Sequence, residues 1–197
     1  MQDWSAFIAA MRVGGWVVYP LTVLAVLAIA IILDRAYVFA RFSSYSEQNL
    51  VTVPRGNAFR RVAEAITGNG ATPIWLREAK AQAAAVHIER DMGRGLWVLE
   101  TIVTAAPLLG LLGTIVGMMH SFQLFGGQGL VNPGGVTGGV AQSLVATAIG
   151  LVVALIALFA FNYFSRRLER MMDDLEAFAT EKLAEIRLDQ ETLEAAT

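Results

Sequence analysis

The sequence predicts an all-α integral membrane protein with three transmembrane helices and long cytoplasmic helical extensions. Residues 101–165 contain no Asp, Glu, Lys or Arg, and a soluble fold of this size would rarely go so long without a charge. Only 16% of the 197 residues are charged, against roughly 25% in a typical soluble domain, and the mean hydropathy is positive at +0.53. Because each buried charge costs roughly 2.5–3.5 kcal/mol on membrane-insertion scales, these observations favour helices that cross a bilayer.

The first span is expected at residues 15–33, after an N-terminal segment of residues 1–14. This uncharged run, at about 1.5 Å per residue, is long enough to cross a hydrocarbon core of roughly 30 Å. Trp16 and Tyr19 lie at its start, where aromatic residues typically meet the membrane interface.

A polar region is expected at residues 34–97, followed by the second span at residues 98–125. Within the polar region, residues 57–67 predict one short helix, and Pro73 can open a longer one. The second span can simply continue that longer helix. Pro107 is expected to kink or loosen the second span, because proline lacks the backbone N–H that an α-helix uses.

A glycine-rich loop is expected at residues 126–139, followed by the third span at residues 140–164. The loop carries no charge and is too flexible in composition to be a folded domain. Residues 165–197 then predict an amphipathic tail helix, because apolar residues recur there at spacings of three and four. Such a stripe favours packing on the polar region or on a neighbouring subunit over a fully solvated tail.

The basic residues predict the orientation in the membrane. Arginines follow the first span, precede the second and follow the third, whereas Arg12 is the only basic residue on the other side. By the positive-inside rule, the N-terminus and the glycine-rich loop lie outside, while the polar region and the C-terminus lie inside.

Small residues line one face of each of the last two spans at helical spacing. They include Gly110, Gly113 and Gly117 in the second span, and Ser143 and Gly150 in the third. Faces of this kind let two helix backbones approach closely.

Each of these spans also holds a threonine near its middle, Thr114 and Thr147. One interpretation is plain packing, in which each hydroxyl bonds to a carbonyl one turn back. The other is a polar pathway between helices. A proton relay normally needs Asp, Glu or His, and no span carries an acid or base well inside it, so a second chain would have to supply the titrating group. Gln142, near the outer end of the third span, is a candidate polar contact, whether across helices or near the headgroups.

Composition and motifs argue against several other classes of protein. A net charge of −2 gives no reason to expect a nucleic-acid partner. The chain has no cysteine and only two distant histidines, so no metal-ligand spacing is present. No Gly-Lys-Ser/Thr follows the glycine-rich loop, as a phosphate-binding loop would require. We therefore expect neither an enzyme nor a metal site.

Two long motifs resemble a known family. Residues 106–119, APLLGLLGTIVGMM, resemble the second-span signature of the ExbB/TolQ/MotA proton-channel family, and residues 139–151, GVAQSLVATAIGL, resemble its third-span signature. Residues 15–20 and 34–35 are similar to the two ends of the family's first span. The resemblance covers all three spans in order and is closest to the ExbB branch.

The resemblance implies a subunit of a motor in the inner membrane of a Gram-negative-type bacterium, with residues 1–14 and 126–139 in the periplasm. Such subunits form pentamers in the lipid bilayer, and their small helix faces pack around an ExbD- or TolR-like single-span partner. The partner's aspartate lies beside threonines that match Thr114 and Thr147. Proton flow, with no cofactor, then energises a TonB-like protein for uptake across the outer membrane. Many members carry a glutamate at the position of Gln142, so a titrating role there does not carry over.

Other functions remain as alternatives. The nearest is a TolQ-like role in envelope maintenance, and a non-conducting membrane scaffold comes from a different class. A flagellar stator subunit fits less well, since that branch has four spans and a larger charged cytoplasmic domain. A small-solute transporter would usually show internal repeats, and this chain shows none.

Overall fold

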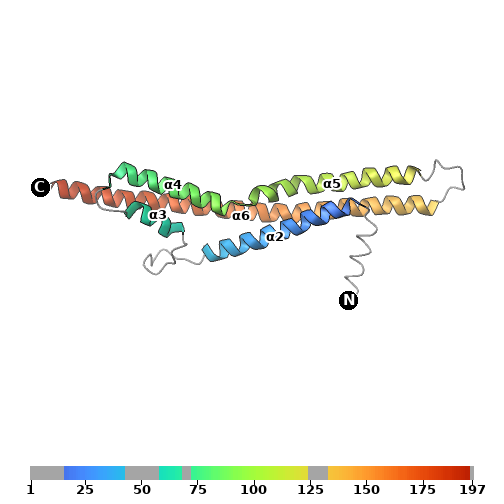
Figure 1. Ribbon diagram of the computed structural model, residues 1–197, viewed down its shortest axis with the longest axis horizontal. Helices are drawn as coiled ribbons and strands as arrows, with labels where there is room; N and C mark the ends of the chain where they lie inside the picture. The colour runs from blue at the N-terminus through green and yellow to red at the C-terminus, as the bar shows by residue number, and fades with distance from the viewer. Residues whose placement is uncertain (1–15, 43–57, 68–71, 124–132, 196–197) are drawn as a thin grey trace. The chain divides into compact units, whose positions relative to one another are not determined.

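The computed structural model describes residues 16–42, 58–67, 72–123 and 133–195, and within these ranges the chain forms five helices (Figure 1). They are α2 (Val18–Phe42), α3 (Ala58–Thr67), α4 (Ile74–Met92), α5 (Leu96–Gln123) and α6 (Pro133–Ala195). The expected segment 1–14, the loop residues 126–132 and the last two residues of the tail lie outside the described residues.

Three helical stretches are long and apolar enough to cross a membrane. They lie within Val18–Ala40, Ile74–Phe122 and Gly138–Thr192. This confirms the predicted all-α fold with three candidate membrane spans. α5 and α6 also expose large apolar side chains, among them Leu108, Phe122, Leu144 and Phe159, each at least 60% exposed. Many exposed large apolar side chains on one helix pair are expected where the helices face lipid or another chain.

The chain divides into two compact units. Unit 1 comprises Met1–Leu33 and Gly95–Asn162, and unit 2 comprises Asp34–Arg94 and Tyr163–Thr197. α2 and α6 each contribute residues to both units, whereas α5 belongs to unit 1 and the described helices α3 and α4 belong to unit 2.

In unit 1, α5 and α6 run antiparallel. Gly110 lies against Thr147, and Gly117 lies against Ser143, so rising numbers in α5 meet falling numbers in α6. The turn that leads into α2 joins this pair, since a Cβ built on Gly113 would lie 3.4 Å from Cγ1 of Val17. The unit is thus a three-helix arrangement held at its centre by small residues.

In unit 2, the tail part of α6 packs on residues of the polar region. The rings of Phe59 and Phe178 meet edge to face with their centroids 5.7 Å apart. Arg187 of α6 pairs with Glu78 of α4 at 3.4 Å. Leu175 is buried, as the predicted apolar stripe requires. The packing on the polar region expected from that stripe is therefore present within unit 2.

α4 and α5 are separate helices, so the second span does not simply continue the helix that Pro73 precedes. Gly93 caps the end of α4, where its N–H donates to the carbonyl of Glu89 at 2.8 Å. Gly95 then has a φ of +82°, a left-handed conformation that glycine adopts without the steric cost of a Cβ. α5 starts directly after it, and Pro107 lies inside α5.

α6 begins at Pro133, so residues 133–139 are helical although the sequence places them in a glycine-rich loop. Proline favours the first turn of a helix because its fixed φ already suits that turn and its missing N–H is not needed there. Gly139 is also held in close contact with α5, because a Cβ at this position would collide with the hydroxyl oxygen of Ser121. Packing against α5 thus accounts for helix in a segment of poor intrinsic propensity.

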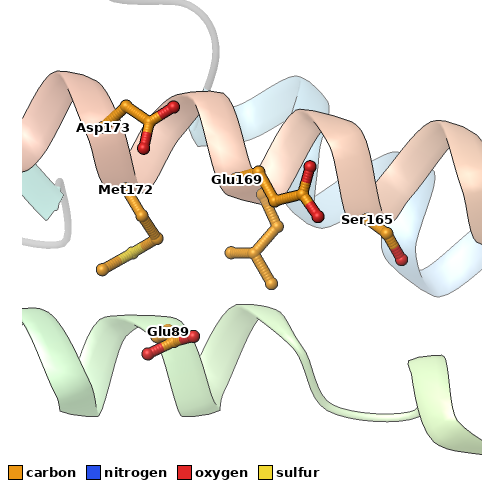
Figure 2. A pocket seen from close by; sticks show the side chains of 6 residues that line it. Glu89, Ser165, Glu169, Met172 and Asp173 are labelled. Carbon is orange, nitrogen blue, oxygen red and sulfur yellow. The ribbon is translucent and has the colours of Figure 1, made fainter.

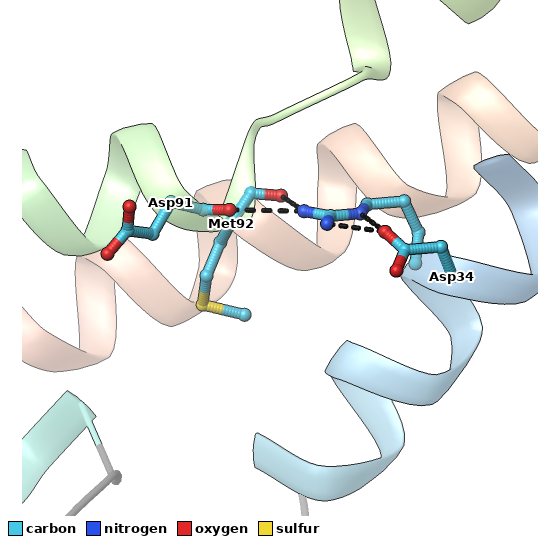
Figure 3. Close-up of polar contacts among 4 residues, drawn as sticks. Asp34, Asp91 and Met92 are labelled. Atoms are coloured by element: carbon cyan, nitrogen blue, oxygen red, sulfur yellow. Dashed lines mark hydrogen bonds and ion pairs between the residues drawn. The ribbon is translucent and has the colours of Figure 1, made fainter.

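Arg35 fastens α2 to the end of α4 within unit 2 (Figure 3). Its buried guanidinium donates to the carbonyls of Asp91 at 3.1 Å and Met92 at 3.0 Å, and it pairs with Asp34 at 2.6 Å. The last carbonyls of an α-helix lack partners inside the helix, so a cation placed there both satisfies them and complements the helix dipole.

Candidate functional site

The small residues predicted on two helix faces meet where α5 packs on α6. A Cβ added to Gly110 would lie 3.0 Å from Cα of Thr147, and one added to Gly150 would lie 2.5 Å from the carbonyl oxygen of Ala106. A Cβ on Gly117 would lie 2.6 Å from that of Ser143. These positions have no room for a side chain, so the two backbones come as close as glycine allows.

The structure thus brings together all five predicted small residues, Gly110, Gly113, Gly117, Ser143 and Gly150. What they contact here belongs to the same chain, namely the other helix of the pair and, for Gly113, also Val17. Their further role around a partner chain stays a prediction.

Thr147 forms a hydrogen bond between the two helices. Its hydroxyl donates to the backbone carbonyl of Gly110 at 2.8 Å, and its side chain is half-buried. A hydroxyl has one hydrogen and two lone pairs, so this bond uses the donor and leaves the oxygen as an acceptor. Thr147 therefore links α6 to α5 through its hydroxyl hydrogen, while its hydroxyl oxygen can still accept a hydrogen bond.

Thr114 bonds within its own helix instead. Its hydroxyl donates to the carbonyl of Leu111 at 2.7 Å, which is the local bond expected from the plain packing interpretation. In the part of the chain that the structure describes, no hydrogen bond joins Thr114 to Thr147. The two predicted pathway residues therefore lie on the paired helices α5 and α6 without contacting each other through a hydrogen bond.

Two serines are buried at the same helix contact. Ser121 donates to the carbonyl of Gly117 at 2.9 Å, and Ser143 donates to that of Val140 at 2.7 Å. Every buried side-chain N or O atom among the described residues has a partner. The α5–α6 contact therefore contains hydroxyl groups, and each buried one has a hydrogen-bond partner. The backbone of Gln142 lies in α6, and its side chain lies outside the described set.

Charge is almost absent from unit 1. Over residues 16–33 and 95–162 the sequence contains a single Asp, Glu, Lys or Arg, which is Glu100 near the start of α5. The only other ionisable side chains in these residues are His120 and Tyr19. Glu100 stands at the edge of the uncharged run, so the sequence pattern alone does not single it out.

A pocket of about 360 Å³ lies in unit 2 between α4 and α6 (Figure 2). Glu89 of α4 lines one side, and Met172 extends toward α4 from the other. The remaining lining residues are Ser165, Leu168, Glu169 and Asp173. Although three carboxylates border it, no group of three His, Cys, Asp or Glu side chains among the described residues could hold a metal ion.

The three candidate spans and the contact between α5 and α6 define the class of protein. It is a multi-span helical membrane protein in which α5 and α6 pack closely, carry several hydroxyl groups and are nearly free of charge. The chain belongs to the MotA/TolQ/ExbB proton channel family, since the sequence model of that family matches residues 53–177. The family comprises membrane proteins associated with proton flow and transport, and is not a known family of enzymes.

Individual relatives carry the ExbB name. The chain is 34% identical over 171 residues to the biopolymer transport protein ExbB-like 3 of Synechocystis, covering 77% of this chain and 81% of that protein. It is 34% identical over 91 residues to the biopolymer transport protein ExbB of Aquifex aeolicus, covering 46% of this chain and 62% of that protein. Against the Neisseria gonorrhoeae ExbB it is 34% identical over 125 residues, 64% of this chain and 54% of that protein. The chain thus spans less than two thirds of the length of the last two relatives.

Proposed function

We propose that this chain is an ExbB-like subunit of a motor driven by the proton-motive force, which energises TonB-dependent uptake across the outer membrane. The observation that carries the proposal is the bond from the Thr147 hydroxyl to the Gly110 carbonyl. It places a hydroxyl acceptor inside a helix pair that carries almost no charge. The kinship with proteins named ExbB supplies the class of motor.

The proton pathway runs past Thr147 and Thr114. A threonine hydroxyl orients water or a carboxyl group but does not titrate near neutral pH, so the titrating acid comes from a second chain. That chain is a single-span protein of the ExbD or TolR kind with an aspartate in its membrane segment. Because the Thr147 hydrogen is already donated to Gly110, the threonine oxygen can accept a hydrogen bond from the protonated form of that acid.

The energy available is adequate for mechanical work. One elementary charge crossing a potential of 100 mV gains about 2.3 kcal/mol, so a few protons per step can move a partner helix. That movement is then passed to a TonB-like protein. No cofactor is needed, because the proton gradient drives the cycle.

Assembly places several copies of the chain around the partner, with five as the expected number. The small face of Gly110, Gly113, Gly117, Ser143 and Gly150 sets how closely α5 and α6 approach one another beside the partner helices. The exposed apolar side chains of both helices contact lipid and neighbouring copies. Gln142, at the beginning of the third span, adds a neutral polar contact.

The subunit lies in the inner membrane of a Gram-negative-type bacterium with its N-terminus outside. The arginines support this orientation, since they lie within the regions assigned to the cytoplasm, residues 34–97 and 165–197, close to the ends of the spans. On this assignment unit 2, with its ion pairs and acidic pocket, is the cytoplasmic part of the subunit.

Native mass spectrometry of the full chain tests the proposal. The chain would be purified in detergent alone and after co-expression with the single-span, aspartate-bearing protein of the same organism. We expect a pentamer that takes up two partner chains. A monomer or dimer that ignores the partner would overturn the proposal and favour a scaffold. Selective uptake of a TolR-type rather than an ExbD-type partner would assign the envelope-maintenance role instead.

A further inference from the structure

We infer that Glu100 is the group through which protons are exchanged between the helix pair and the water at the Gly95 end of α5. The inference rests on the proposed function, because it names a residue that serves the same pathway. It assigns the chain a carboxyl group of its own on the proton path, in addition to the acid brought by the partner.

The carboxylate of Glu100 is isolated from other charged side chains along these parts of the sequence. Glu100 is the single charged side chain in residues 16–33 and 95–162, and it lies within the second span expected at residues 98–125. Charged residues inside membrane segments are costly and usually mark ion or proton paths. Glu100 is also exposed, so its carboxylate is open to water or to another chain.

Glu100 lies on the same face of α5 as two threonines. At about 100° per residue, Glu100, Thr104 and Thr114 fall within roughly 80° of one another around the helix. The same arithmetic puts Gly110 and Gly117 to one side of this face, toward α6. Glu100 and the predicted pathway residue Thr114 therefore share one side of α5, next to the side that packs on α6.

Hydrogen-bond acceptors lie on α5 between Glu100 and Thr114. Thr104 donates its hydroxyl hydrogen to the carbonyl of Thr101 at 2.9 Å, which leaves its oxygen as an acceptor. Pro107 has no N–H, so the carbonyl of Val103 lacks the helix partner it would otherwise have one turn further on. Between Glu100 and Thr114 this face thus offers a hydroxyl oxygen and a backbone carbonyl on which water can be ordered.

The distance along α5 from Glu100 to Thr114 is compatible with the thickness of a membrane. Fourteen residues separate Glu100 from Thr114, or about 21 Å along the helix axis, against roughly 30 Å for a hydrocarbon core. Thr114 then lies well inside the bilayer and Glu100 near its boundary. The carboxylate takes a proton from water in the pathway and releases it to bulk water, or the reverse, so no other reactant is required.

The other ionisable side chains of residues 16–33 and 95–162 do not lie at the Gly95 end of α5. His120 lies about 30 Å further along α5, toward the opposite membrane face. Tyr19 lies in α2 and not on α5. The alternative is a purely structural role for Glu100, since an acid near a helix N-terminus complements the helix dipole. That role would affect stability and not the pH dependence of conduction.

The test compares full-length variants co-reconstituted with the single-span partner in vesicles loaded with a pH-sensitive dye. We expect Glu100→Gln to lower potential-driven proton flux on the order of 10²-fold, the scale of losing a positioned acid–base group. We also expect it to flatten the dependence of flux on the pH of the compartment that Glu100 faces. Glu100→Asp should restore most of the flux. Glu176→Gln, on an exposed acid of α6 in unit 2, serves as the matched control and should conduct as the wild type does.

The outcomes separate the two proposals. Wild-type vesicles that conduct no protons would overturn the proposed function itself. Conducting wild type with equal flux and an unchanged pH profile in Glu100→Gln would overturn only the role of Glu100. Loss of flux with a matching loss of thermal stability, not restored by aspartate, would assign Glu100 to the helix and would also overturn the inference.

Discussion

The hydroxyl of Thr147 donates a 2.8 Å hydrogen bond to the backbone carbonyl of Gly110, from α6 to α5. The bond depends on the glycine, because Cα of Thr147 lies only 3.0 Å from where a Cβ of residue 110 would be. Packing and polarity are therefore coupled at this point. A side chain added at position 110 would therefore disturb both the spacing of the helices and the hydrogen bond of Thr147.

Substitution at Gly150 is expected to destabilise unit 1. In Gly150→Ala, the new methyl group would lie 2.5 Å from the carbonyl oxygen of Ala106 and must push α5 and α6 apart. Overpacking of this kind costs about 1–3 kcal/mol. Thermal unfolding in detergent should show a lower midpoint. Gly138→Ala is the control, since a Cβ there meets nothing within 4 Å. Equal midpoints for the two variants would contradict the close approach of the helices.

Removing the guanidinium of Arg35 is expected to loosen unit 2. Arg35→Gln deletes the charged donors to the carbonyls of Asp91 and Met92, and hydrogen bonds from charged groups contribute about 1.5–3 kcal/mol each. Hydrogen exchange at the end of α4 should accelerate. The control is Arg61→Gln, which removes a half-exposed ion pair of 3.6 Å to Asp91 that should contribute about 0–1 kcal/mol. Unchanged exchange in the Arg35 variant would show that the end of α4 does not depend on this contact.

The break before α5 is expected to require glycine at position 95. With φ at +82°, Gly95→Ala would strain the backbone by about 1–2 kcal/mol. Its Cβ would also lie 3.3 Å from Cγ2 of Ile31, which adds a tight contact. A lower unfolding midpoint than in the wild type is the predicted result. A variant as stable as the wild type would mean that the turn can take another conformation.

Much of the fold could be predicted from the sequence because membrane helices have a strong signature. The uncharged run of residues 101–165 and the apolar run of residues 15–33 correspond to helices that can span a bilayer. The spacing of glycines also predicted which residues would allow close approach. These are properties of one helix at a time, and they can be read without knowing its neighbours.

The remainder depends on contacts between distant residues. Nothing in the spacing of Thr147 says that its hydroxyl reaches Gly110 instead of a carbonyl in its own helix. The contact of Arg35 with the end of α4 joins residues more than fifty positions apart and leaves no periodic pattern. Likewise, helix in residues 133–139 follows from packing on α5, which outweighs the low helix propensity of glycine.

Proton flux through the reconstituted chain and its single-span partner, compared between the wild type, Thr147→Val and Thr147→Ser, tests the central claim most directly. Valine keeps the shape of threonine but removes the hydroxyl that bonds Gly110, whereas serine keeps it. We predict flux in the wild type and the serine variant, and none in the valine variant although it still assembles, as native mass spectrometry can verify. Full flux through an assembled Thr147→Val complex would contradict a polar pathway at this residue.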